Sequence, residues 1–272
     1  RLRLAAPQSP IVPRLEGDLA MAQKRYKDAV ADYAKAADAS SDTALVVAQF
    51  NAARLAGLAN PQKVLESWLV QQPQDVPARI ALAEYLGASS ATERAIAEYE
   101  GALKALPGNA ILLNNLAVQY QKQGDARALA TAEQAYSAAP DNPAIQDTYG
   151  WLLVETGSLD KGLQLLRRSA KTLANVPEAQ FHLGVALAKK GETAEARRLL
   201  EQVVAGPAAA DHLDQVLDGV DVLELVELGP AQLVAVQERA GRGQRPRVGP
   251  RHSREQVGAR GPLPDQPVAA VG

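Results

Sequence analysis

A pattern that returns every 33 or 34 residues constrains this chain more than any other feature. Small residues recur at Ala83, Ala117, Gly150 and Gly184, with spacings of 34, 33 and 34. A fixed period of this size is typical of repeat architectures, in which each unit buries its apolar face against its neighbours. The period therefore predicts a row of similar units rather than one globular core.

Each period also contains a second set of small residues, and a turn lies between the two sets. The second set follows the first by 11 or 12 positions and consists of Ala95, Ala128, Gly162 and Ala196. Gly124, Gly157 and Gly191 lie between the sets, and glycine readily adopts the positive φ that often ends a helix. The pattern predicts two antiparallel helices per unit that touch at small side chains.

These residues resemble the tetratricopeptide repeat (TPR), a helix-turn-helix unit of about 34 residues. The resemblance covers roughly residues 10–206 as six units. The second unit, roughly 44–75, is degenerate because Pro61 falls near the start of its second helix. Proline is tolerated in a first helical turn, so we expect this unit to keep two helices joined by a longer turn. The resemblance implies an all-α fold, a right-handed α-solenoid of about six repeats.

A narrower resemblance runs from Leu113 to Val203. This part is similar to the C-terminal repeats of the TPR lipoproteins encoded with the bacterial PEP-CTERM/exosortase sorting system, which are associated with exopolysaccharide production and envelope protein sorting. The similarity rests on the runs Leu113–Ala117, Gly124–Leu129, Ala139–Pro143 and Asp147–Leu153. It implies a lipoprotein fragment on the periplasmic side of a bacterial envelope, and a cytoplasmic location stays open as the alternative.

The residues with catalytic or metal-binding potential are few and scattered. The chain has no Cys, and its three His residues, His182, His212 and His252, have no second His at ligand spacing. It contains no glycine-rich phosphate loop and no nucleophile motif. We therefore expect no enzyme activity, no catalytic residue, no cofactor and no metal. His182 is interpreted as a packing or groove-lining residue.

The expected partner is a protein or peptide, and composition gives no sign of a nucleic-acid or membrane partner. The net charge is −2, hydrophobic residues make up 47% and aromatic residues only 4%. Such a profile suits close-packed helices. The acidic and basic residues are nearly balanced along the array, so no basic stripe for nucleic acid is predicted. No stretch approaches the roughly 20 apolar residues of a membrane span.

The ends of the chain differ from the array. Residues 1–9 are interpreted as an N-terminal linker, and residues 10–206 as the TPR array. Residues 207–228 are interpreted as a capping helix because Leu213, Val216, Leu217 and Val220 keep helical spacing. Residues 229–272 are rich in Gly, Pro and Arg and favour a poorly ordered or artefactual tail. The start at Arg1 without Met is interpreted as that of a fragment.

A groove along the first helices is the predicted binding surface, because in stacked hairpins of this type these helices line the concave side. The predicted groove residues are Asn114, Val118, Gln121, Lys122, Asp147, Trp151, Glu155, Phe181, Val185 and Lys189. The strip is completed by Ile80, Glu84, Gly87, Val154 and Ala188. Asn114 can bond a peptide backbone, and tryptophan is frequent at binding hot spots. Core packing for Trp151 and a partnerless surface position for Asn114 stay open as alternatives.

The predicted function is a protein-protein interaction scaffold that recognises an extended or helical partner segment in this groove. By resemblance, the scaffold would serve envelope or exopolysaccharide assembly. TPR proteins of the carboxylate-clamp type hold the C-terminal carboxylate of a partner and need Asn at equivalent positions of successive first helices. In this chain the equivalent of Asn114 in the next unit is the acidic Asp147, which opposes capture of a carboxylate. Two alternatives stay open: a passive structural spacer in a larger lipoprotein, and a regulatory module of an enzyme whose catalytic domain lies outside this fragment.

Overall fold

The computed structural model describes residues 9–209. Within this range the chain forms twelve α-helices and no strand. The helices are α2 (Ile11–Ala22), α3 (Tyr26–Ser40), α4 (Thr43–Leu55), α5 (Lys63–Gln71), α6 (Val76–Ala88), α7 (Thr92–Ala105), α8 (Ala110–Gln123), α9 (Arg127–Ala138), α10 (Pro143–Glu155), α11 (Leu159–Thr172), α12 (Pro177–Lys190) and α13 (Thr193–Ala209). Consecutive helices pair as six hairpins, from α2–α3 to α12–α13. The predicted all-α solenoid of about six units is confirmed.

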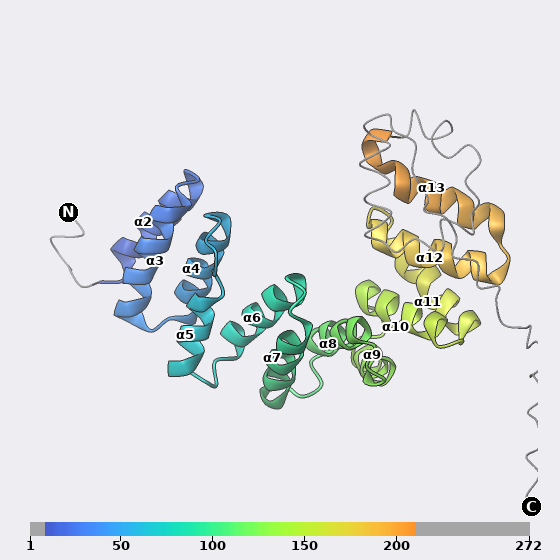
Figure 1. Ribbon diagram of the computed structural model, residues 1–272, viewed down its shortest axis with the longest axis horizontal. Coiled ribbons are helices and arrows are strands. Elements are labelled where there is room, and N and C mark those ends of the chain that lie inside the picture. Colours follow the sequence, from blue (N-terminus) through green and yellow to red (C-terminus); the bar gives the residue numbers. More distant parts are fainter. Residues whose placement is uncertain (1–8, 210–272) are drawn as a thin grey trace, which may run out of the picture.

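The hairpins form one curved row (Figure 1). The first helices α4, α6, α8 and α10 follow the inner side of the curve, and the second helices α7 and α9 follow the outer side. Each first helix contacts its own second helix, and three of them also contact the first helix of the next unit: α4 contacts α6, α8 contacts α10, and α10 contacts α12. The inner face is therefore built from equivalent helices of successive units.

Small residues lie where the two helices of a hairpin touch, as the sequence predicts. Ala83 and Ala117 have no exposed surface. A Cβ atom added to Gly184 would lie 2.8 Å from two side-chain atoms of Leu200 in α13. A Cβ atom on Gly162 would lie 2.5 Å from the carbonyl oxygen of Gly150, which is far inside van der Waals contact. Glycine at positions 150 and 162 lets the backbones of α10 and α11 approach each other, and Gly184 leaves room for Leu200 between α12 and α13.

Local signals set the helix ends. Gly124, Gly157 and Gly191 have φ values of 70°, 91° and 86°, the left-handed region that favours glycine. At the other end, the Asn109 side chain accepts hydrogen bonds from the first N–H groups of α8, and Asn142 does the same for α10. These caps satisfy backbone donors that no intrahelical carbonyl can reach.

The second unit keeps both helices, with the longer turn that the sequence predicts. Its second helix, α5, has only nine residues and begins two positions after Pro61. The unit is tied to the next one through Asp75, which caps α6 by accepting a hydrogen bond from the Ala78 N–H at 3.0 Å. The Trp68 indole N–H donates to the other oxygen of Asp75 at 2.7 Å, and the Thr43 hydroxyl donates to the same atom. Three helices thus meet at one carboxylate.

The predicted terminal segments lie largely outside the described residues. Only position 9 of the linker 1–9 is described, and α13 reaches Ala209, so only the first three positions of the predicted capping helix 207–228 are described. The tail 229–272 lies wholly outside them, and the predicted division of the chain at 206 stays a prediction. None of the helices within residues 9–209 has both the length and the hydrophobicity needed to cross a bilayer.

Candidate functional site

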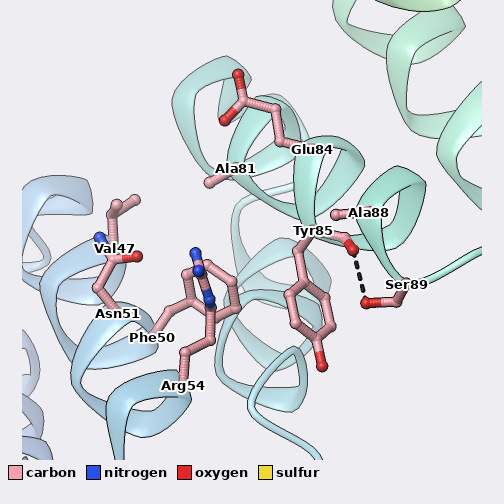
Figure 2. Close-up of a pocket in the computed structure, with 9 residues that line it drawn as sticks. All are labelled: Val47, Phe50, Asn51, Arg54, Ala81, Glu84, Tyr85, Ala88 and Ser89. Carbon is pink, nitrogen blue, oxygen red and sulfur yellow. Dashed lines mark hydrogen bonds between the residues drawn. The ribbon is translucent and has the colours of Figure 1, made fainter. Parts of the chain in front are cut away.

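A cavity of about 310 Å³ opens on the inner face between α4 and α6 (Figure 2). Both helices line it with residues at the spacing i, i+3, i+4, i+7, which is one helical face. Each α4 position has its equivalent in α6 34 residues later. The lining residues are Val47, Phe50, Asn51 and Arg54 from α4, and Ala81, Glu84, Tyr85, Ala88 and the following Ser89 from α6.

Two aromatic rings and one cation dominate this cavity. The rings of Phe50 and Tyr85 meet edge to face, with centroids 5.4 Å apart and an interplanar angle of 86°. The Arg54 guanidinium lies over the Phe50 ring, with Cζ 5.8 Å from the ring centroid (Figure 2). Phe50 is buried, whereas Arg54 and Glu84 are exposed at the rim. An apolar floor with charged groups at its rim suits a side chain that enters from solvent.

Sequence reasoning identified only part of this site. Glu84 belongs to the predicted strip, but Phe50, Arg54 and Tyr85 were not assigned to it. The second unit has Gln49 at the position equivalent to Ala83, so the small-residue pattern does not extend to α4. The available signal was the 34-residue spacing itself, which makes Phe50 of α4 the equivalent of Glu84 of α6 on the corresponding helical face.

Two predicted groove residues of α8 form hydrogen bonds with neighbouring units. Lys122 Nζ donates to the carbonyl oxygen of Gly87 at 3.4 Å, and Gln121 Nε2 donates to Glu155 Oε2 at 2.7 Å. These contacts tie α8 to α6 on one side and to α10 on the other. Val118, on the same helix, is half-buried. Hydrogen bonds to neighbouring units therefore already occupy some of the polar groups of this helix.

Asn114 is buried rather than exposed, so the alternative of a partnerless surface residue is wrong. Its side chain is 9% exposed, and its Nδ2 group lies 3.5 Å from Asn115 Oδ1. Its Oδ1 atom has no hydrogen-bond partner among the described residues. The equivalent residue of the next unit, Asp147, likewise has a buried Oδ1 without a partner within residues 9–209. The two acceptors occupy the same position on successive first helices.

The first helices α10 and α12 bring three of the predicted residues together with His182. Nδ1 of His182 lies 2.8 Å from Asp147 Oδ2. The His182 ring stacks on Trp151 with centroids 4.5 Å apart and planes 14° apart. Lys189 Nζ lies 6.0 Å from the centroid of the same indole. Trp151 thus packs against the next unit and is half-buried, which agrees with the core-packing alternative, and its role in partner binding stays a prediction.

Phe181 and Val185 need correction as groove residues. They are only 3% and 2% exposed, respectively, and they lie in the cluster that packs α12 against its neighbours. Both lie on the side of α12 that packs against its neighbours, and α12 contacts α10, α11 and α13. Neither side chain offers surface to a partner.

The Asp147–His182 contact yields a stability prediction. His182→Leu removes the group that contacts the buried Asp147 carboxylate, and we expect a loss of about 2 kcal/mol in the free energy of unfolding. Asp147→Leu combined with His182→Leu removes both polar groups and should recover part of that loss. Urea unfolding of the four proteins in this double-mutant cycle measures the coupling. Strictly additive losses would show that the contact contributes nothing.

No group of three or more His, Asp and Glu side chains in the described part of the chain is placed to hold a metal ion. The inner face instead offers aromatic rings, amides and both signs of charge, which are the groups that recognise peptides.

Comparisons with known proteins bear on the fold. A scan against protein-family models finds no match, and a search of curated proteins finds none either. Among solved structures, PilW, described as a widely conserved type IV pilus biogenesis factor, matches with a TM-score of 0.61 and 15% identity, over 76% of this chain and 98% of PilW. YrrB, described as a TPR protein with an unusual peptide-binding site, matches with a TM-score of 0.50 and 17% identity, over 68% of this chain and 97% of YrrB. The chain has the TPR fold. The link to the PEP-CTERM system finds no counterpart in these similarities.

Proposed function

We propose that this TPR solenoid is an interaction scaffold that binds a segment of a partner protein along the inner face of its first helices. The observation that carries the proposal is the cavity between α4 and α6, which opens on the helical face equivalent to the one that bears Trp151. A continuous strip of equivalent positions gives an extended or helical segment several contacts in register. The peptide-binding site described for YrrB supports this use of the fold.

We place the proposed partner in bacterial envelope or exopolysaccharide assembly. Two observations support this context: the resemblance of Leu113–Val203 to envelope TPR lipoproteins, and the similarity in fold to PilW, a pilus biogenesis factor. The scaffold itself would supply binding surface and no catalytic step, because its inner face offers recognition groups rather than a nucleophile paired with a base.

Capture of partners by the chain and by a groove variant tests the proposal. The triple variant Asn114→Ala, Trp151→Ala and Lys189→Ala removes an amide, an indole and a cation from the inner face. We expect crosslinked capture from the native organism's extract to fall by about tenfold or more, because truncated hot-spot residues typically cost over 1 kcal/mol each. Lys104→Ala, Gln134→Ala and Arg168→Ala, on the second helices, form the matched control and should leave capture unchanged.

Two results would contradict the proposal. If the folded triple variant captures the same partners at the same level, the passive-spacer alternative is favoured. If the control triple loses capture instead, binding belongs to the outer face. Thermal unfolding of both triple variants verifies that the solenoid is intact before capture is compared.

A further inference from the structure

The first helices α10 and α12 repeat the geometry of α4 and α6, because each residue of the later pair lies 101 positions after its equivalent. Trp151 is thus the equivalent of Phe50, and His182 and Lys189 are the equivalents of Ala81 and Ala88. An aromatic ring stands on the first helix of both pairs. The residues opposite that ring differ, and this difference has a structural consequence.

Between α10 and α12, side chains of the chain itself fill the space over the aromatic ring. His182 stacks on Trp151 at 4.5 Å, and Lys189 lies over the same ring at 6.0 Å. In the earlier pair, Ala81 and Ala88 end at Cβ and cannot reach across to α4. The cavity of about 310 Å³ lies between these alanines and the α4 face. The α4/α6 cavity therefore exists because two large side chains of the later unit are absent here.

The residues around the α4/α6 cavity determine which kind of side chain can fill it. At α10, Asp147 gives the His182 ring a polar partner, but the equivalent residue of α4 is Val46, which is buried. A ring in the α4/α6 cavity would therefore find no acceptor at that position. The Arg54 guanidinium, which lies over Phe50, has no carboxylate within ion-pair distance among the described residues. A planar guanidinium of this kind stacks well on an aromatic face.

From this comparison we infer that the α4/α6 cavity accepts an uncharged aromatic side chain of the partner segment, which stacks against Arg54 and fills the place that His182 fills between α10 and α12. The inference rests on the proposed function, since it names the anchor residue of the segment bound on the inner face. Tyr85 and Phe50 contribute the apolar edge of the site, and the cavity volume falls at the lower end of the roughly 300–1,000 Å³ typical of ligand pockets.

A filled-cavity variant tests the inference. Peptides selected from a random dodecapeptide library on the immobilised chain should be enriched in Phe, Tyr or Trp at one position. Synthetic copies of these peptides should bind Ala81→Phe at least about tenfold more weakly than the parent chain, because the new ring occupies the cavity from within. Ala105→Phe adds the same ring at an exposed position of α7, and it should change affinity by less than about twofold.

The outcomes separate this inference from the proposed function. Selected peptides that bind the inner face without an aromatic residue, or that bind Ala81→Phe as well as the parent, would overturn the inference and leave the proposed function standing. A library that yields no binder would contradict both. Ala88→Phe fills the same cavity from its exposed rim, and it replaces Ala81→Phe in the test if that variant unfolds.

Discussion

Gly162→Leu is expected to lower the free energy of unfolding by more than about 3 kcal/mol. A Cβ atom on Gly162 would lie 2.5 Å from the carbonyl oxygen of Gly150 and 2.6 Å from Val154 Cγ2. The closest of these atoms belongs to the backbone, so a larger side chain must push α10 away from α11. Urea unfolding followed by circular dichroism measures the loss.

Two further variants make this prediction specific. Gly162→Ala adds only the Cβ atom, and we expect a smaller loss of about 1–2 kcal/mol, because the higher helix propensity of alanine offsets part of the clash. Gly101→Leu is the matched control, since the group nearest to its Cβ is the flexible side chain of Arg79. A loss for Gly101→Leu as large as that for Gly162→Leu would contradict the role of close backbone approach.

Asp75→Ala is expected to lower the free energy of unfolding by about 2 kcal/mol. The substitution removes the cap of α6, worth about 1 kcal/mol. It also removes the acceptor of the Trp68 indole N–H and of the Thr43 hydroxyl, which adds a cost of similar size. Because these groups come from α5 and the start of α4, the change should weaken the junction of the second and third units. Guanidinium unfolding monitored by tryptophan fluorescence measures it.

The effect of Asp75 should depend on pH. Burial alone would raise the pKa of Asp75, but the hydrogen bonds from Thr43, the Ala78 N–H and Trp68 hold it below its usual value. A carboxyl with a depressed folded-state pKa stabilises fully above its unfolded pKa of about 3.9, and this stabilisation is lost as the pH falls through the folded pKa. The difference between the parent and Asp75→Ala should therefore be constant above about pH 5 and shrink toward pH 2.

Asn142→Ala supplies the control for this pH dependence. Asn142 caps α10 through the N–H groups of Ala144 and Ile145, and its amide does not titrate. The loss caused by Asn142→Ala, about 1 kcal/mol, should stay the same across this pH range. If the Asp75→Ala difference stays equally constant down to pH 2, the pKa of Asp75 is not depressed in the folded protein, which would contradict the stabilising role of its hydrogen bonds.

Much of the fold could be predicted because the signals that shape each unit are local to that unit. Ala83, Ala117, Gly150 and Gly184 recur at one helical phase and are all buried, and the two glycines lie where a second helix touches the first. The glycines with positive φ, such as Gly124, follow from local backbone sterics alone. Such signals need no knowledge of how one unit is rotated against the next.

The inner face was harder to predict because it depends on that rotation. The repeat register places Val185 on the same helical phase as Trp151, yet Val185 is fully buried and Trp151 is only half-buried. The hydrogen bond between Gln121 and Glu155 and the stacking of His182 on Trp151 join residues of different units. The cavity at Phe50 depends on two alanines of the following unit. These features follow from packing between units, which the period alone does not fix.

The surface that contacts a bound peptide can be mapped directly, because the chain has no native cysteine. Single thiols are introduced at exposed positions of the first helices by Ala88→Cys, Lys122→Cys and Lys189→Cys, and at exposed positions of the second helices by Lys104→Cys, Gln134→Cys and Arg168→Cys. A library-selected peptide bearing a thiol-reactive crosslinker is then added. We predict crosslinks at the first-helix thiols alone. Crosslinks confined to the second-helix thiols would contradict binding on the inner face.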